Sequence, residues 1–170
     1  MDMNTLAEQK VKTLRDMPAH ARVWIYKTAR SLGQAEQKLI REHGALFTAT
    51  WAAHGAALDA CVDVLEDRFV AVAVDEVQAL ASGCSIDKSV GFIKQLEMDL
   101  NLMLTDRMVV VFERDGGIHS TRLQDLPALI AEGELSSDTI VFDDLVDTVG
   151  ELRKRFRVRL ADSWMNRFLS

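Results

Sequence analysis

The sequence has little cysteine and little proline, and it has no long apolar run. Cys61 and Cys84 are the only cysteines among 170 residues, which excludes a disulfide framework of the kind found in small secreted domains. The longest uncharged stretch in a predicted strand, residues 69–74, is far too short to span a bilayer. No basic segment followed by an apolar run opens the chain, so no signal peptide is expected. These absences favour a cytoplasmic protein with free thiols and no membrane partner.

An excess of positive charge is also missing. The chain carries 26 acidic and 20 basic residues, a formal net charge of −6. This balance argues against nucleic acid as a partner, because a general nucleic-acid binder neutralises phosphates with clustered lysine and arginine. The one dense basic cluster lies just after an acidic stretch, and this pattern predicts ion pairs within the chain. The cluster comprises Arg153, Lys154, Arg155, Arg157 and Arg159.

Nucleotide-binding and metal-binding motifs are absent as well. No GxxxxGK[ST] pattern occurs, which excludes nucleotide hydrolysis by a P-loop. No cysteine or histidine pair has the short spacing of zinc ligands. His43 and His54 are about three helical turns apart, too far to share one metal ion on a straight helix. We therefore expect neither a metal nor a cofactor.

The apolar residues that are present alternate between the two-residue period of strands and the longer period of helices. The predicted strands and long helices, in chain order, are 22–27 (strand), 34–54 (helix), 58–64 (strand), 68–74 (strand), 86–100 (helix), 108–112 (strand) and 118–123 (strand). This order favours an α+β fold in which an antiparallel sheet carries both helices on one face. It predicts a ferredoxin-like βαββαβ core over about residues 20–123.

The rest of the chain has weaker signals. Residues 4–16 predict a short amphipathic helix that ends before Pro18. Residues 124–170 predict an irregular helical extension, in which Thr148 and Glu151 form a capping box. No linker or repeat divides the sequence, so residues 1–170 are expected to form a single domain.

The most informative stretch is Ser82-Gly83-Cys84-Ser85-Ile86-Asp87, which lies at the start of the second long helix. Unpaired backbone N–H groups and the helix dipole favour negative charge at such a position. This predicts a non-catalytic binding or interaction module that holds a small anionic ligand there. The candidate ligand-binding residues are Ser82, Gly83, Ser85, Asp87 and, close by, Trp51.

Cys84 offers an alternative from another class. A helix N-terminus lowers the pKa of a thiol, so Cys84 could act as a nucleophile, with His54 as its base. A simpler interpretation is a small side chain beside a serine cap. Cys61 alternates with apolar residues and is expected to be structural. A further alternative is a homodimer built on an exposed sheet face or edge.

Five segments together resemble a family of small, uncharacterised bacterial proteins, some of which carry the label "ABC transporter ATPase". The segments are residues 21–26 (ARVWIY), 51–55 (WAAHG), 82–87 (SGCSID), 139–142 (TIVF) and 162–168 (DSW followed by RF). The resemblance covers nearly the whole chain from about residue 17. It implies no established activity and no functional residue.

Overall fold

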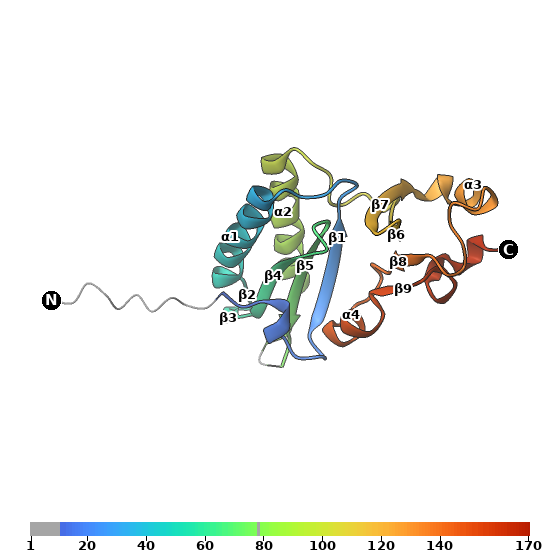
Figure 1. Cartoon of the computed structure of the whole chain (residues 1–170). Helices are drawn as coiled ribbons and strands as arrows, with labels where there is room; N and C mark the ends of the chain where they lie inside the picture. Colours follow the sequence, from blue (N-terminus) through green and yellow to red (C-terminus); the bar gives the residue numbers. More distant parts are fainter. Residues whose placement is uncertain (1–10, 78) are drawn as a thin grey trace.

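The computed structural model describes residues 11–77 and 79–170 and has an α+β fold with antiparallel sheets, which confirms the predicted fold class (Figure 1). The predicted helix at 4–16 lies partly outside the described residues, and only a single 3₁₀ turn, η1, forms at its end. The elements are η1 (Leu14–Asp16), β1 (Arg22–Lys27), α1 (Gln34–Thr50), β2 (Ala52–Ala53), β3 (Ala56–Ala57), β4 (Asp59–Leu65), β5 (Phe69–Asp75), α2 (Gly83–Leu100), β6 (Val109–Arg114), β7 (Gly117–Arg122), η2 (Leu123–Asp125), α3 (Leu126–Ala131), β8 (Ile140–Phe142), α4 (Val149–Arg155), β9 (Arg157–Arg159), η3 (Leu160–Asp162) and η4 (Trp164–Phe168).

The first sheet has the strand order β1-β5-β4, and both neighbouring pairs are antiparallel. Helices α1 and α2 cover one face of it, as predicted (Figure 1). The central strand β5 reads Phe-Val-Ala-Val-Ala-Val, and all six of these residues are buried. A strand that is apolar on both faces needs cover on both faces. Here α1 and α2 cover one face, and η1, α4 and the second sheet cover the other.

The fourth predicted strand does not join this sheet. β6 lies in a second sheet of order β7-β6-β8-β9, so a complete ferredoxin-like sheet is not confirmed. Segments without regular secondary structure lie beside β1 instead. Val23 N–H donates to the Asp147 carbonyl at 2.9 Å, and Lys27 N–H donates to the Leu104 carbonyl at 3.2 Å. β8, which lies in the predicted extension at 124–170, pairs with β6 of the predicted core.

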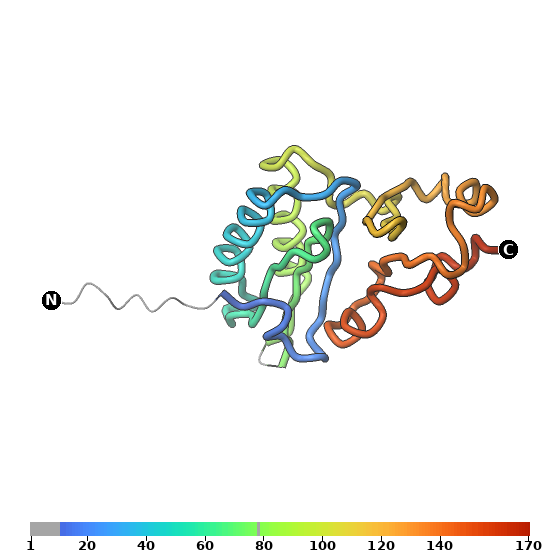
Figure 2. Tube along the Cα trace, in the orientation of Figure 1, coloured from blue at the N-terminus to red at the C-terminus, as the bar shows by residue number. Residues whose placement is uncertain are grey.

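The two sheets meet through an aromatic cluster and buried polar contacts. The ring centroid of Phe69 lies 5.3 Å from that of Phe142 and 4.9 Å from that of Phe156. Beside the rings, Lys27 Nζ pairs with Asp144 Oδ2 at 2.6 Å. Arg68, which is 8% exposed, donates to the carbonyls of Ala29 and Ile118. The chain therefore continues from the first sheet into the second through a packed junction (Figure 2).

Three hairpin connections each contain two successive residues with positive φ angles; two of them are two-residue turns, and the connection through Glu66-Asp67 also includes Arg68. The turns are His54-Gly55, Glu66-Asp67 and Asp115-Gly116. The first corrects the predicted helix at 34–54, which ends at Thr50 and gives way to the β2–β3 hairpin. The sequence Ala-Ala-His-Gly-Ala-Ala has no strand propensity, so its glycine resembled a helix end.

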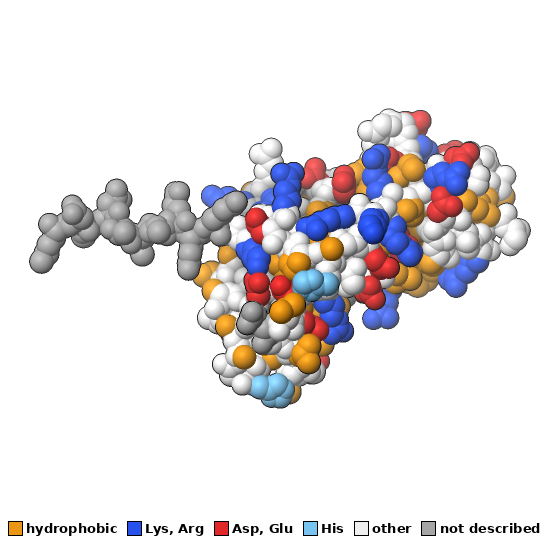
Figure 3. Space-filling view, turned by 90° about the horizontal axis from the view of Figure 1, so that it is seen from below, with side chains coloured by type: hydrophobic (Ala, Val, Ile, Leu, Met, Phe, Trp, Pro, Cys, Tyr) orange, Lys and Arg blue, Asp and Glu red, His pale blue; other side chains and the backbone are white. Residues whose placement is uncertain are grey.

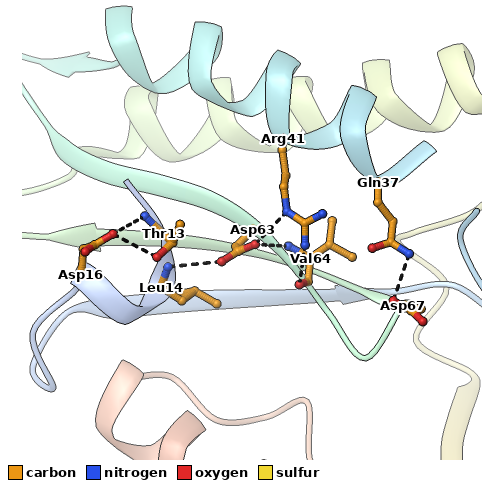
Figure 4. Close-up of polar contacts among 8 residues, drawn as sticks. All are labelled: Thr13, Leu14, Asp16, Gln37, Arg41, Asp63, Val64 and Asp67. Atoms are coloured by element: carbon orange, nitrogen blue, oxygen red, sulfur yellow. Dashed lines mark hydrogen bonds and ion pairs between the residues drawn. The ribbon is translucent and has the colours of Figure 1, made fainter. Parts of the chain in front are cut away.

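The free edge of β4 is occupied by other parts of the chain. The Asp63 carboxylate accepts hydrogen bonds from Leu14 N–H at 3.3 Å, Arg41 Nε at 3.2 Å and Val64 N–H at 2.8 Å (Figure 4). Arg41 Nη2 also donates to the Val64 carbonyl at 3.3 Å. A second copy could pair with this edge only after displacing Arg41, which disfavours a dimer formed there.

Gly44 sets the distance between α1 and β4, and its replacement by alanine is expected to destabilise the protein. A Cβ atom at Gly44 would lie 2.5 Å from Val62 Cβ, which cannot move without shifting β4. Overpacking of this kind costs about 2 kcal/mol even after the helix propensity of alanine is counted. Urea unfolding measures the change. Gly91→Ala on α2, where nothing lies within 4 Å, is the matched control and should not destabilise. Equal effects of the two variants would contradict the close contact.

Candidate functional site

The predicted site at Ser82–Asp87 is a capped helix start. Ser82 Oγ accepts a hydrogen bond from Ser85 N–H at 3.2 Å, and Ser85 Oγ donates to the Ser82 carbonyl at 2.8 Å. Both hydroxyl groups therefore serve the first turn of α2, and Ser85 is buried. Gly83, Cys84 and Asp87 are exposed. The groups left for a ligand are the backbone amides of the first residues, since the serine side chains are engaged.

The structure brings Trp51 to this helix start, as predicted. The indole Nε1 donates to the Ser85 carbonyl at 2.8 Å, and the Trp51 side chain is 2% exposed. A buried indole whose donor is satisfied anchors the β2–β3 hairpin to α2. Trp51 is thus a structural link in this cluster and does not present a ring surface to a ligand.

The proposed pair of Cys84 and His54 is not formed in the structure. Both residues are exposed, and among the described residues no hydrogen bond joins them. His54 lies in the left-handed turn of the β2–β3 hairpin, with φ of 50°. Cys61 is buried as expected, and this burial raises the pKa of its thiol to about 12, which keeps it protonated and unreactive.

A polar pocket of about 390 Å³ lies instead at the end of the first sheet where β1 begins and β5 ends. The α4 helix starts against the same end (Figure 1), and Figure 3 shows this side of the molecule from below, with imidazole, acidic and basic side chains among apolar ones. Six residues line the pocket: His20, Arg22, Glu76, Val77, Asp147 and Thr148.

Carboxylates hold the basic groups of this sheet-end pocket in place. His20 Nε2 lies 2.9 Å from Asp75 Oδ1, and Arg22 Nη1 donates to Glu76 Oε1 at 3.3 Å. The hydrogen bond from His20 and a second from Val77 N–H lower the pKa of the Asp75 carboxyl group. Because each carboxylate engages one nitrogen, the other ring nitrogen of His20 and the other guanidinium N–H groups are left to donate to a ligand.

The Arg22 guanidinium is further fixed by stacking. Its Cζ atom lies 4.7 Å from the centroid of the Trp24 ring, on the same strand. On the α4 side, Thr148 Oγ1 accepts from Glu151 N–H and caps the helix, as the capping-box pattern predicted. Asp147 is exposed, and its carboxylate forms no hydrogen bond with the described residues. The pocket therefore presents the Arg22 guanidinium, a His20 ring nitrogen and the Asp147 carboxylate, which no hydrogen bond among the described residues engages.

Sequence reasoning missed this pocket because its residues come from three distant segments. The pair Asp75-Glu76 at a strand end was the one signal in the sequence that could have indicated it. Arg22 begins a predicted strand and His20 lies two residues before it, but nothing in the pattern placed α4 beside that strand. The Arg22–Thr148 bridge that joins them is a long-range contact.

Three of the five residues of the C-terminal basic cluster form ion pairs within the chain, as predicted. Arg155 bonds Asp143 at 2.8 Å, Arg157 bonds Glu113 at 2.6 Å and Arg159 bonds Asp162 at 2.8 Å. Arg153 donates instead to the carbonyls of Leu14 and Met17.

Within residues 11–77 and 79–170, no three histidine, cysteine or acidic side chains are grouped so that they could hold a metal ion. Nor does any described helix combine the length and apolar content needed to cross a bilayer. Comparison with family models, with curated proteins and with solved structures gave no match for this chain.

Proposed function

We propose that this protein is a non-catalytic binding module whose ligand is a small molecule carrying both an anionic group and an amine. The observation that carries the proposal is the sheet-end pocket, which is lined by both Arg22 and His20 and by the carboxylates of Glu76 and Asp147. A carboxylate or phosphate would pair with the guanidinium and the imidazole. An ammonium group would pair with Glu76 or Asp147. A purely anionic ligand would meet the carboxylates of Glu76 and Asp147, and a purely cationic one would meet the Arg22 guanidinium.

The sequence favoured a small anion at Ser82–Asp87, and the pocket is the better-supported place for the same kind of group. The start of α2 offers backbone amides but no positively charged side chain held in place, whereas the sheet-end pocket has the Arg22 guanidinium, which is fixed by stacking on Trp24. The cysteine-enzyme alternative has no base for Cys84 among the described residues, so nothing supports it here. We also propose that the protein is cytoplasmic and that it is related to the small bacterial proteins that it resembles. The two free cysteines support the location.

Free α-amino acids are the natural probes, because each carries a carboxylate beside an ammonium group. In a thermal-shift panel, at least one is expected to raise the melting temperature by about 5 °C when present at 100 times its Kd. Its decarboxylated amine and its deaminated acid should each have much smaller effects. Arg22→Gln should abolish the shift, while Arg107→Gln, an exposed arginine on the α2–β6 connection, should keep it.

Two outcomes would contradict the pocket. The first is a panel in which no amino acid changes the melting temperature of the wild-type chain. The second is a shift that Arg22→Gln and Arg107→Gln reduce equally, since Arg22 alone of the two lines the pocket. If the deaminated acid raises the melting temperature as strongly as the amino acid, the ligand needs only an anionic group. That result would refute the role of Glu76 and Asp147.

A further inference from the structure

The charges of the sheet-end pocket do not balance. Among the residues that line it, Arg22 has a permanent positive charge, whereas Glu76 and Asp147 both carry carboxylates. The His20 imidazole is engaged by a third carboxylate, that of Asp75, at 2.9 Å. Carboxylates therefore outnumber cations whether or not His20 is protonated. A ligand with one anionic group and one ammonium group has no net charge and would leave this excess uncompensated.

Glu76 and Asp147 lie on opposite sides of β1. Glu76 directly follows β5, which pairs with β1 along its whole length. Asp147 lies in the segment on the other side, where its carbonyl accepts a hydrogen bond from Val23 N–H at 2.9 Å. Because neighbouring strands are about 5 Å apart, roughly 10 Å separates the two outer backbones, with Arg22 between them. The pocket therefore offers two places for positive charge, one on either side of the guanidinium.

The place beside Asp147 is the less compensated of the two. Glu76 already accepts from Arg22 at 3.3 Å, whereas the Asp147 carboxylate forms no hydrogen bond with the described residues. Asp147 interacts electrostatically with Arg155, but that guanidinium donates to the buried Asp143 carboxylate at 2.8 Å. A second cation on the ligand would compensate the charge of Asp147.

Val77 gives the pocket an apolar wall. Its side chain is 67% exposed and follows Glu76 directly in the chain. Lysine and arginine have an apolar stem that ends in a positive charge, so they combine apolar contact with a distant cation. An acidic side chain would instead bring a further carboxylate beside Glu76 and Asp147. The pocket volume of about 390 Å³ lies within the range of small-molecule sites.

We propose that the ligand of the sheet-end pocket is a basic α-amino acid whose second cation binds Asp147. This inference rests on the proposed function and narrows its class of ligand. The α-carboxylate pairs with Arg22 and His20, and the α-ammonium group pairs with Glu76. The charged end of the side chain reaches Asp147 from the other side of Arg22.

Isothermal titration of the full chain with lysine and with norleucine tests this assignment. The two amino acids share a four-carbon stem, and norleucine lacks the ammonium group at its end. Lysine should bind the wild-type chain with a Kd at least about tenfold lower. Asp147→Asn should remove this preference by weakening lysine, while the Kd of norleucine stays the same. Asp125→Asn is the matched control, because this exposed aspartate changes the net charge equally and its side chain caps no helix.

The outcomes separate this inference from the proposed function. Equal affinities of the wild-type chain for lysine and norleucine would overturn the second contact and leave amino-acid binding in place. A preference for lysine that Asp147→Asn retains would also overturn it, because the terminal ammonium group would then bind elsewhere. If neither amino acid binds, the inference and the proposed function both fail. The wild-type comparison needs no variant, and the exposure of Asp147 predicts that Asp147→Asn folds.

Discussion

Replacement of Phe69 by alanine is expected to lower the free energy of unfolding by about 4 kcal/mol. Phe69 is completely buried where the two sheets meet, and its ring contacts Phe142 and Phe156. Removal of the ring loses its transfer free energy and leaves a cavity. The cavity cannot collapse easily, because its walls belong to β5, β8 and the end of α4, which are held by separate hydrogen-bonded networks.

Urea unfolding followed by circular dichroism measures this loss. Phe168→Ala is the control, because Phe168 is a half-buried phenylalanine of the last 3₁₀ turn, away from the junction. It should cost much less than Phe69→Ala. If both substitutions cost the same, the aromatic cluster contributes no more than an ordinary apolar contact. A transition that separates into two steps in Phe69→Ala would show that this ring couples the two sheets.

Replacement of Asp144 by alanine is expected to destabilise the protein by about 3 kcal/mol. The Lys27 side chain is 7% exposed, and Asp144 Oδ2, at 2.6 Å from its Nζ, is its one hydrogen-bond acceptor among the described residues. Without this carboxylate the desolvated ammonium group loses its hydrogen-bonded partner, and the charge of Asp106, which forms no ion pair with it, is the counter-charge that remains. The cost is larger than that of a surface ion pair such as Lys38–Glu42, both of whose side chains are more than half exposed.

A double variant separates the cost of an orphaned charge from the value of the pair. Lys27→Met combined with Asp144→Leu replaces both charges by apolar groups of similar size, so it should be markedly more stable than Asp144→Ala alone. Urea unfolding of the single and double variants gives the comparison. A double variant that is less stable than the single one would mean that the ion pair itself, not the avoidance of an unpaired charge, holds the junction.

The sequence was most informative where the pattern is local. The apolar period of β5, the alternation in β4 and the long period of α2 predicted elements that the structure contains. These signals arise because each element buries one or both of its faces, and the spacing of its apolar residues reflects which faces are buried. The turn at Glu66-Asp67 falls between the strands predicted at 58–64 and 68–74.

The arrangement of the elements could not be predicted in the same way. Nothing in the pattern distinguishes a fourth strand beside β1 from a strand in a second sheet, because β6 would be apolar in either place. The β2–β3 hairpin was missed because alanine carries no strand signal. The sheet-end pocket needs Arg22 and Thr148 to be neighbours, and only the tertiary contact supplies that.

The contact of β1 with the segment before α4 bears on how the protein is made. Val23 N–H and Val149 N–H donate across this contact to the carbonyls of Asp147 and Ala21, so one side of β1 is completed by residues that lie far later in the sequence. A nascent polypeptide leaving the ribosome must therefore carry β1 with an unsatisfied side until residues 147–149 have been translated. Incomplete products of translation share this defect, which makes them natural substrates for chaperones and proteases.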